Sequence, residues 1–282
     1  MSEFTEVGER LWVARYEWWD VNVSVIEGEA GLLVVDTHAS TKAASEVIAD
    51  LRRLSSRPVI GLVNTHDHFD HTFGNSAFRE AYGEVPITAH ESTANTTIST
   101  GRQTQETMTA RRDDRAGEVA ETHLVAADHS FSSVTAIDLG DRSVELVHPG
   151  RGHTAGDLVV RVDDADVLLA GDLVEESGMP AYGVDCFPME WPLSLDLALQ
   201  LIGPDTVVVP GHGAPVDRDF VMEQRSSIGV VAETIRDLAG RGVPLSQALD
   251  ATQWPYPSEG LGEAVRRAYE QLPRDAKRLP LL

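Results

Sequence analysis

The feature that most constrains this 282-residue chain is the motif His-Asp-His-Phe-Asp-His at positions 66–71. It places three imidazoles and two carboxylates within six residues, directly after the apolar run 59–63. That run predicts a buried strand, so the motif lies where a strand ends and its side chains can converge on one point. A catalytic zinc site uses few imidazole and carboxylate ligands and keeps one position open. Because the motif offers more ligands than one zinc ordinarily uses, it predicts a paired metal site.

Three further residues of ligand type follow strand-like runs later in the chain. His153 lies in a Gly-rich segment, Asp172 ends the apolar run 167–171 and His212 follows the run 207–209. Gly residues flank each of the three and allow the backbone to come close to a site. The alternative interpretation of the motif, a solvated loop that is rich in His by chance, does not account for this series. Metal binding is therefore the preferred hypothesis.

The order of these residues resembles the pattern of the metallo-β-lactamase-fold hydrolases. That pattern is an HxHxDH motif, then a His in a GHT-type loop, a bridging Asp after a strand, and a His in a late GH loop. All seven positions are matched in this chain, by His66, His68, Asp70, His71, His153, Asp172 and His212. The resemblance spans about residues 11–213. It implies an α/β (α+β) fold, a four-layer αβ/βα sandwich.

The resemblance also implies how the ligands are shared. One zinc would be held by the first two histidines of the motif and His153, the second by Asp70, His71 and His212, and Asp172 would bridge both. Asp70 would also orient the nucleophile, so Asp70 and Asp172 are the expected catalytic residues. Zinc lowers the pKa of bound water to about 7, which gives a hydroxide for attack on a carbonyl or phosphoryl centre. Two Zn²⁺ ions are expected, although manganese or iron bind the same ligand types.

Three substrate classes follow from the resemblance. A carboxylic ester, thioester or lactone is the first expectation, because Asp172 resembles the bridging ligand of glyoxalase II-like and lactonase-like members. A β-lactam is the second; the exported β-lactam hydrolases usually carry Cys or Ser at the position of Asp172. The third, from a different class, is oxidation of a persulfide by a mononuclear iron site of two His and one Asp. Cys186 is not expected to act as a nucleophile.

Composition limits the partners and the compartment. The net charge is −22, from 45 acidic and 23 basic residues, and no Lys/Arg-rich stripe offsets it, which argues against nucleic acid and favours a small-molecule substrate. No apolar run approaches about 18 residues, so no membrane span is expected. The segment 1–6 lacks the features of a secretory signal, and a single cysteine excludes an internal disulfide. These features favour the cytoplasm; the oligomeric state, a homodimer included, stays open.

Hydrophobic periodicity predicts one domain over residues 1–282. Antiparallel strands are expected within 7–35, and α/β alternation begins with a helix over 40–54. The polar stretch 91–123 predicts a helical insertion over the site entrance, with a surface helix or a disordered loop as alternatives. C-terminal helices are expected from residue 217.

Three further positions near the motif have expected roles. Asp36 ends a predicted strand and is expected to support the site. His38 either supports a metal ligand or is an exposed loop residue, and the second interpretation is preferred. Trp18 and Trp19 either cover a core edge or form a wall of the site. The loop 174–191 follows Asp172 and should lie over the metals.

Further candidates follow from that arrangement. The loop 174–191 offers four candidate pocket walls, for which ordinary loop packing is an equal alternative, namely Met179, Tyr182, Phe187 and Trp191. Three histidines border the insertion and are expected at the surface, namely His90, His123 and His129.

Overall fold

The computed structural model describes residues 3–273. Met1 and Ser2, at the start of the segment without signal features, and residues 274–282, at the end of the expected single domain, lie outside the described residues. The organisation of 1–282 as one domain therefore stays a prediction.

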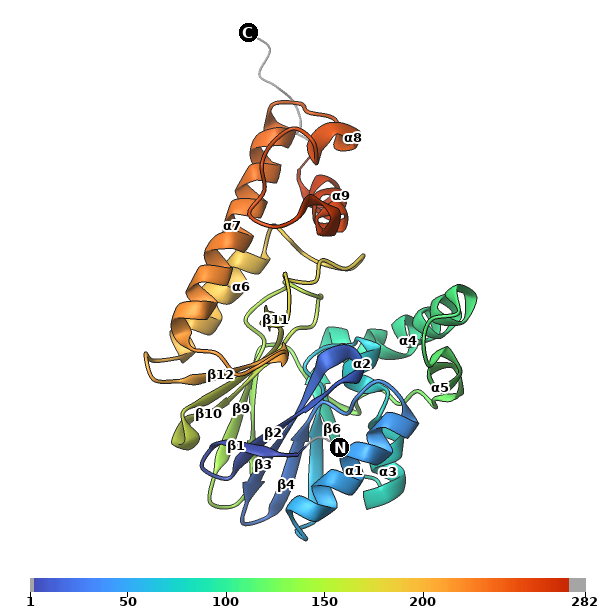
Figure 1. Cartoon of the computed structure of the whole chain (residues 1–282). Coiled ribbons are helices and arrows are strands. Elements are labelled where there is room, and N and C mark those ends of the chain that lie inside the picture. The colour runs from blue at the N-terminus through green and yellow to red at the C-terminus, as the bar shows by residue number, and fades with distance from the viewer. Residues whose placement is uncertain (1–2, 274–282) are drawn as a thin grey trace.

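Twelve strands in the described range form one continuous hydrogen-bonded sheet with two halves. The strands of the first half are β1 (Thr5–Gly8), β2 (Leu11–Tyr16), β3 (Val21–Gly28), β4 (Gly31–Val35), β5 (Val59–Val63), β6 (Ile87–His90) and β7 (His129–Phe131). Those of the second half are β8 (Val134–Asp138), β9 (Ser143–Val147), β10 (Val159–Val162), β11 (Val167–Glu175) and β12 (Val207–His212). The halves are joined between β3 and β12 by a single residue pair, Val21 and His212. Figure 1 shows the strands converging toward the middle of the molecule.

The helices lie between and around these strands. They are α1 (Thr41–Leu54), α2 (Phe69–Thr72), α3 (Asn75–Tyr82), α4 (Glu91–Arg111), α5 (Ala116–Glu121), α6 (Trp191–Ala198), α7 (Arg218–Gly240), α8 (Leu245–Ala248) and α9 (Gly262–Gln271). Short 3-10 turns include η1 (Trp18–Asp20) and η4 (Ser258–Gly260). Two helix starts are capped by side chains: the Ser40 side chain accepts a hydrogen bond from the Ala43 N–H, and that of Asp217 accepts one from the Phe220 N–H.

Alternate residues of the strands pack into different cores, which shows that the two halves of the sheet lie face to face. On β4, Val34 packs in the core that includes α1 and α3, while its neighbour Leu33 packs in a core shared by strands of both halves. On β11, Leu168 packs with α6, α7 and α9, and Leu169 joins the shared core. Helices thus cover the outer face of each half. This confirms the four-layer αβ/βα sandwich.

Helices α4 and α5 occupy most of the stretch 91–123 and project beside the sandwich (Figure 1). The His90 ring caps α4 by accepting a hydrogen bond from the Ser92 N–H at 3.2 Å. It also stacks on the His148 ring, with centroids 3.8 Å apart. His90 is therefore buried, and the prediction that it lies at the surface is wrong, whereas His123 and His129 are exposed. In the described part of the chain no helix is long and apolar enough to cross a membrane.

A candidate dinuclear metal centre

The seven residues of the sequence pattern come together in space. Asp172 lies within β11, which runs on to Glu175, and not at a strand end as predicted. The side-chain ligand atoms of the seven residues form two clusters, in each of which these atoms all lie within 4.8 Å of one another. The first cluster is His66, His68, His153 and Asp172; the second is Asp70, His71 and His212. All are buried except His68, which is half-buried. The division matches the one that the resemblance implied, although the role of each residue as a ligand stays a prediction.

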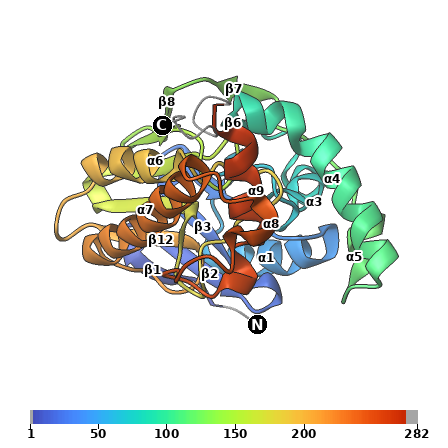
Figure 2. The same cartoon turned by 90° about the horizontal axis from the view of Figure 1, so that it is seen from above.

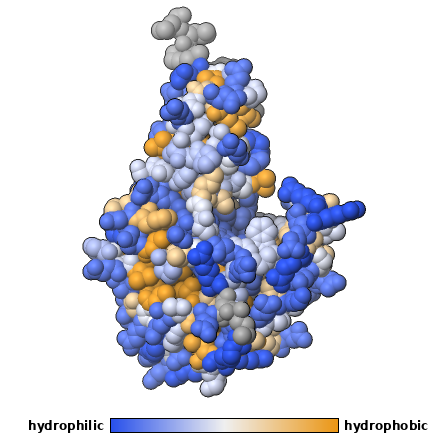
Figure 3. Space-filling view, viewed as in Figure 1, coloured by the Kyte–Doolittle hydropathy of each residue, from blue (hydrophilic) through white to orange (hydrophobic). Residues whose placement is uncertain are grey.

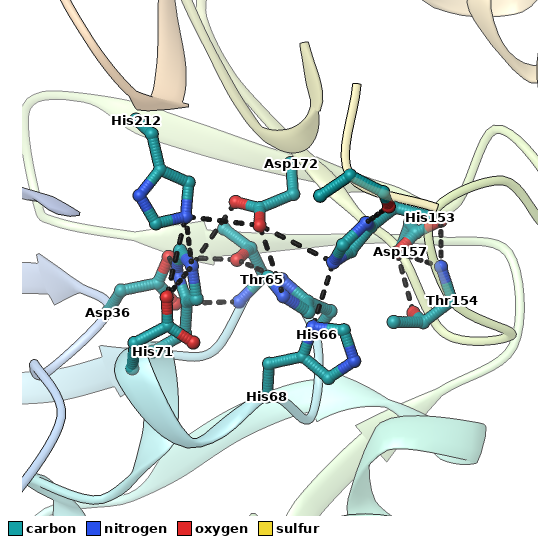
Figure 4. Close-up of polar contacts among 12 residues, drawn as sticks. Asp36, Thr65, His66, His68, His71, His153, Thr154, Asp157, Asp172 and His212 are labelled. Atoms are coloured by element: carbon teal, nitrogen blue, oxygen red, sulfur yellow. Dashed lines mark hydrogen bonds and ion pairs between the residues drawn. The ribbon is translucent and has the colours of Figure 1, made fainter. Parts of the chain in front are cut away.

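Asp172 on β11 lies between the clusters (Figure 4). Its Oδ2 is 3.7 Å from His66 Nε2 and 3.4 Å from His153 Nε2, in the first cluster. The same oxygen is 3.2 Å from His212 Nε2, and Oδ1 is 3.2 Å from His71 Nε2. One carboxylate thus faces four imidazole nitrogens from both clusters. The carboxylate comes this close to β12 because residue 211 is Gly; a Cβ at that position would collide with Asp172 Oδ1.

Each of the five histidines has a hydrogen-bond partner on the ring nitrogen that points away from the centre. The distances are 3.1 Å for His66 Nδ1 to Thr65 Oγ1, 3.0 Å for His68 Nε2 to Asp185 Oδ2, 2.8 Å for His71 Nδ1 to Asp36 Oδ2, 2.9 Å for His153 Nδ1 to the Ala181 carbonyl and 2.8 Å for His212 Nδ1 to the Trp19 carbonyl. Partners of this kind fix the orientation and tautomer of metal-binding imidazoles. The other nitrogen of every ring is left to face the cluster.

The residues present fit a pair of metal cations. His66 Nε2 and Asp172 Oδ1 are buried and have no hydrogen-bond partner. Imidazole nitrogens also face each other, at 2.8 Å between His68 Nδ1 and His153 Nε2 and at 3.4 Å between His71 Nε2 and His212 Nε2. Buried polar atoms without partners are costly. Cations placed among these atoms would give them partners.

Asp36, which follows β4, ties the motif to the neighbouring strand. Its Oδ1 accepts a hydrogen bond from the Thr65 N–H at 2.9 Å, and its Oδ2 accepts one from the Thr65 hydroxyl at 2.8 Å in addition to that from His71. Asp36 has a left-handed φ of 63°, which turns the chain under the motif. The support role expected for Asp36 agrees with these contacts.

The prediction that His38 is exposed is wrong. Only 2 % of its surface is accessible, and its ring lies 5.0 Å from that of Tyr16 and 5.8 Å from that of Trp18. The cause is the turn after β4, where the His38 carbonyl accepts a hydrogen bond from the Gly74 N–H at 3.0 Å. The backbone approaches so closely here that a Cβ at Gly74 would collide with the Thr37 carbonyl.

The imidazoles differ in pKa: His68, His71 and His212 have raised values, and His153 has a lowered one. Burial disfavours the charged form of His212, but the adjacent Asp172 carboxylate outweighs it and raises the pKa of His212 to about 10. Burial likewise opposes charge on His68, yet its hydrogen bond to Asp185 raises the pKa of His68 to about 9. Asp172 and Asp36 hold the pKa of His71 well above its usual range despite burial. Burial lowers the pKa of His153 to about 4.

A cavity of about 780 Å³ opens onto both clusters. The space-filling view shows a hollow between the arm formed by α4 and the part of the molecule that carries the C-terminal helices (Figure 3). One wall is polar and belongs to α4, with Thr100, Gln103, Thr104 and Thr107. The other lining residues include five large apolar side chains, those of Trp19, Phe69, Met179, Tyr182 and Val184. A larger cavity of about 1230 Å³, between α1, η1 and the start of α5, contains neither cluster, so the smaller one is the candidate site.

Two of the four expected loop walls, Met179 and Tyr182, line this cavity, and the other two do not. Trp191 is fully buried behind the site, where its ring N–H donates to the Leu173 carbonyl at 3.1 Å. Phe187 instead lies under the Arg151 guanidinium, 4.3 Å away. Both aromatic side chains thus pack against other residues and do not line the cavity.

The sequence analysis missed Asp185 and Glu175, two carboxylates of the cavity wall. Asp185 contacts His68, while Glu175 accepts hydrogen bonds from the N–H and hydroxyl of Ser177, at 3.1 and 2.6 Å. Neither residue belongs to a motif. Only their proximity to Asp172 along the chain could have indicated a place near the site.

Comparison with known proteins agrees with this geometry. A family model of the Metallo-beta-lactamase superfamily matches residues 16–212. A metallo-beta-lactamase type 2 from Bacillus cereus is 26 % identical over 203 residues, which cover 71 % of this chain and 70 % of that protein. A linear primary-alkylsulfatase from Pseudomonas sp. is 25 % identical over 87 % of this chain, and the match covers 52 % of its own length.

Solved structures share the fold. A metallo-beta-lactamase from Pontibacter korlensis has a TM-score of 0.63 and 23 % identity, with 81 % of this chain and 99 % of that chain covered. A stereoselective inverting sec-alkylsulfatase from Pseudomonas sp. has a TM-score of 0.77 and 17 % identity, with 96 % of this chain covered but 50 % of that one. This chain thus spans about half the length of either alkylsulfatase.

We expect the purified protein to bind two metal ions per chain, one for each cluster. His68→Ala and His212→Ala remove a ligand from different clusters, so each variant should keep one ion, measured by elemental analysis after dialysis. His123→Ala, which changes an exposed histidine, should keep both. A wild-type protein that holds a single ion, unaffected by His212→Ala, would contradict the paired site.

Zinc binding to metal-free protein should release protons at pH 7. The raised pKa values of His68, about 9, and His212, about 10, mean that both rings are protonated at pH 7 and lose charge only as the pH rises through those values. A metal ligand must be neutral imidazole, so binding expels these protons and apparent affinity should increase from pH 7 toward pH 9. Calorimetry in buffers of different ionisation enthalpy measures the release. Equal heats in all buffers would show that the rings are already neutral.

Proposed function

The chain belongs to the Metallo-beta-lactamase superfamily, and on that premise we propose that it is a dinuclear zinc-dependent hydrolase of a carboxylic ester, thioester or lactone. Metal-dependent hydrolysis is the chemistry of the superfamily, and the His/Asp clusters supply a place for the metal. The observation that carries the proposal is the position of Asp172, with Oδ1 near His71 of the second cluster and Oδ2 near both His212 of the second cluster and His66 and His153 of the first. A carboxylate so placed supports two cations rather than one.

Bound zinc would act as a Lewis acid and lower the pKa of a coordinated water, so that a nucleophile is available at neutral pH. The chain itself contributes position and charge. Asp70 Oδ2 lies 3.4 Å from His212 Nε2 and 3.6 Å from His71 Nε2, so its carboxylate is directed into the second cluster. Asp70 is thus placed to orient a nucleophile, and the negative charge of Asp172 offsets part of the repulsion between two cations.

The cavity favours a neutral acyl substrate. Apart from the metal-binding candidates, the charged residues of its wall are three carboxylates, of Asp113, Glu175 and Asp185, and one cation, Arg111. An additional anionic group on the substrate would meet mostly negative charge. An apolar acyl or alkyl group instead finds the wall of Trp19 and its neighbours, and polar oxygens of the substrate find the hydroxyls of α4.

A sulfate ester is the second candidate. It is favoured by the match to the primary-alkylsulfatase, which covers 87 % of this chain and therefore continues past residue 212, where the superfamily match ends. The single cation Arg111 and the acidic wall make it less suitable than a carbonyl ester. A β-lactam, the substrate class in the name of the Bacillus cereus relative, stays an alternative that the substrate panel tests.

A substrate panel tests the proposal. Protein loaded with zinc should hydrolyse at least one neutral ester, thioester or lactone. Its kcat/KM for that substrate, measured from the rate of product formation, should be at least about tenfold above that for alkyl sulfates and β-lactams. Metal content is measured in the same preparation, and chelator-treated protein is the control. Preference for an alkyl sulfate or a β-lactam would replace the proposed substrate class. If the protein purifies with bound iron and oxidises a persulfide, the proposed hydrolysis is wrong and the protein is an oxidoreductase.

Asp172→Asn should cut hydrolysis of the preferred substrate by on the order of a hundredfold or more, because it removes a charge that acts on both cations. The amide keeps the shape of the side chain, so the variant should still fold. The thermal midpoint of the metal-free protein should fall, because the charged His71 and His212 rings lose the carboxylate that faces them. Bound metal should fall at one or both clusters. Wild-type turnover by Asp172→Asn with both ions retained would show that Asp172 has only a structural role on β11.

A further inference from the structure

Asp185 connects the first cluster to the loop of residues 176–190, which runs from β11 to α6. Asp185 Oδ2 accepts a hydrogen bond from His68 Nε2 at 3.0 Å. His68 is the half-buried member of the first cluster, and its other nitrogen faces His153 Nε2 at 2.8 Å. Of the five imidazoles, His68 and His71 have a carboxylate on the outer nitrogen; the other three have a hydroxyl or a carbonyl.

The Asp185 carboxylate determines which nitrogen of His68 serves the cluster. Its Oδ2 lies 3.0 Å from His68 Nε2. A carboxylate accepts hydrogen bonds, so the ring proton is placed on Nε2. Nδ1 is then the free ligand atom. Such carboxylate–imidazole pairs orient a metal ligand and increase its basicity.

The C-terminal helix holds the residue next to Asp185. The Cys186 carbonyl accepts a hydrogen bond from Arg267 Nε at 3.1 Å and one from Gln271 Nε2 at 2.9 Å, both on α9. Cys186 is fully buried, and its N–H donates to the Gly183 carbonyl at 3.2 Å, which closes a turn around Asp185. The backbone on the C-terminal side of Asp185 is therefore anchored to α9.

Helix α9 is itself part of the main core. Ala264, Val265 and Ala268 are buried among residues of α6, α7 and β11. Figure 2 shows α9 next to α7 and α8 when the molecule is seen from above. The helix lies beyond residue 212, where the superfamily match ends. A segment outside the shared region is thus linked to His68 through two successive residues of the loop.

We propose that Asp185 is a positioning residue for His68 and that α9 fixes its place, so that the C-terminal helix sets the metal affinity of the first cluster. The inference rests on the proposed metal-dependent function. Its physical basis is the path of contacts from α9 to the Cys186 carbonyl, and from Asp185 to His68.

If the ion pair of Asp185 and His68 had a purely structural role, removing it would lower the folding stability and leave metal affinity unchanged. The Asp185 and His68 side chains are 36 % and 22 % exposed, and ion pairs in such positions add little to folding stability. Removal of the carboxylate should therefore leave the thermal midpoint of the metal-free protein nearly unchanged. The loss should be found in metal affinity.

The test uses the His212→Ala chain, which should keep only the first cluster functional. Zn²⁺ affinity is measured there by competition with a chelator, and Co²⁺ is used for its visible absorption spectrum. Asp185→Ala should weaken Zn²⁺ binding about 10- to 100-fold and alter the Co²⁺ spectrum. Asp185→Asn keeps an acceptor oxygen without the charge and should lie between Asp185→Ala and the parent. Asp205→Ala, an exposed carboxylate outside the cavity, is the matched control.

The second arm changes α9. Replacing both Arg267 and Gln271 by Ala should weaken Zn²⁺ binding in the same direction, and adding Asp185→Ala should produce less than the product of the two effects, since they act on one path. Arg236→Ala, an exposed residue on α7 with a partner on its own helix, is the control.

The outcomes separate the two proposals. If wild-type protein binds neither Zn²⁺ nor Co²⁺, the proposed function fails and the inference with it. If the parent binds Zn²⁺ and Asp185→Ala retains that affinity within about twofold, Asp185 is not a positioning residue while the proposed function stands. Full multiplicativity of the α9 and Asp185 effects would overturn the role of α9. Should Asp185→Ala fail to fold, Asp185→Asn alone decides, by the same affinity and spectrum.

Discussion

The structure depends on one buried carboxylate that faces four imidazoles. Asp172 has 6 % of its surface exposed, and four ring nitrogens approach it within 3.7 Å. Taking such a charge out of water is expensive unless opposite charge surrounds it. The protonated rings of His71 and His212 provide that charge in the metal-free chain, and cations would provide it in the loaded one. Gly211 lets the Asp172 carboxylate approach β12, and the hydrogen bonds on the outer ring nitrogens hold the five imidazoles in place around the carboxylate.

The sequence predicted the fold and the gathering of the seven residues well, because both depend on local signals. Apolar runs of strand length preceded Asp36, the HxHxDH motif and Asp172, and the strands they form bring these residues together. The strand that carries Asp172 runs on to Glu175, so the prediction that Asp172 ends it is wrong. Prediction failed for His38 and His90, since their burial depends on a backbone turn and on a stacked partner distant in sequence. It also missed Asp185, whose role exists only because the loop folds back onto His68.

The same limit applies to the walls of the cavity. An aromatic residue in a loop near the site is equally compatible with the core and with the cavity, and composition cannot choose between them. Trp191 is buried in the core, where its ring N–H donates a hydrogen bond to the Leu173 carbonyl. Trp19 lies in η1, and 47 % of its surface is exposed. Substrate choice therefore depends on tertiary packing around a ligand set that the sequence makes evident.

The two halves of the sheet meet in one residue pair, Val21 with His212, and that pair lies at the metal centre. The first half of the chain contributes His66, His68, Asp70 and His71, and the second contributes His153, Asp172 and His212. Any cation held by both sets would act as a cross-link across the seam of the molecule. The same cations would then support both catalysis and the association of the two halves of the sheet. Loss of metal would weaken the contact between these halves, while each half keeps its own packing against its helices.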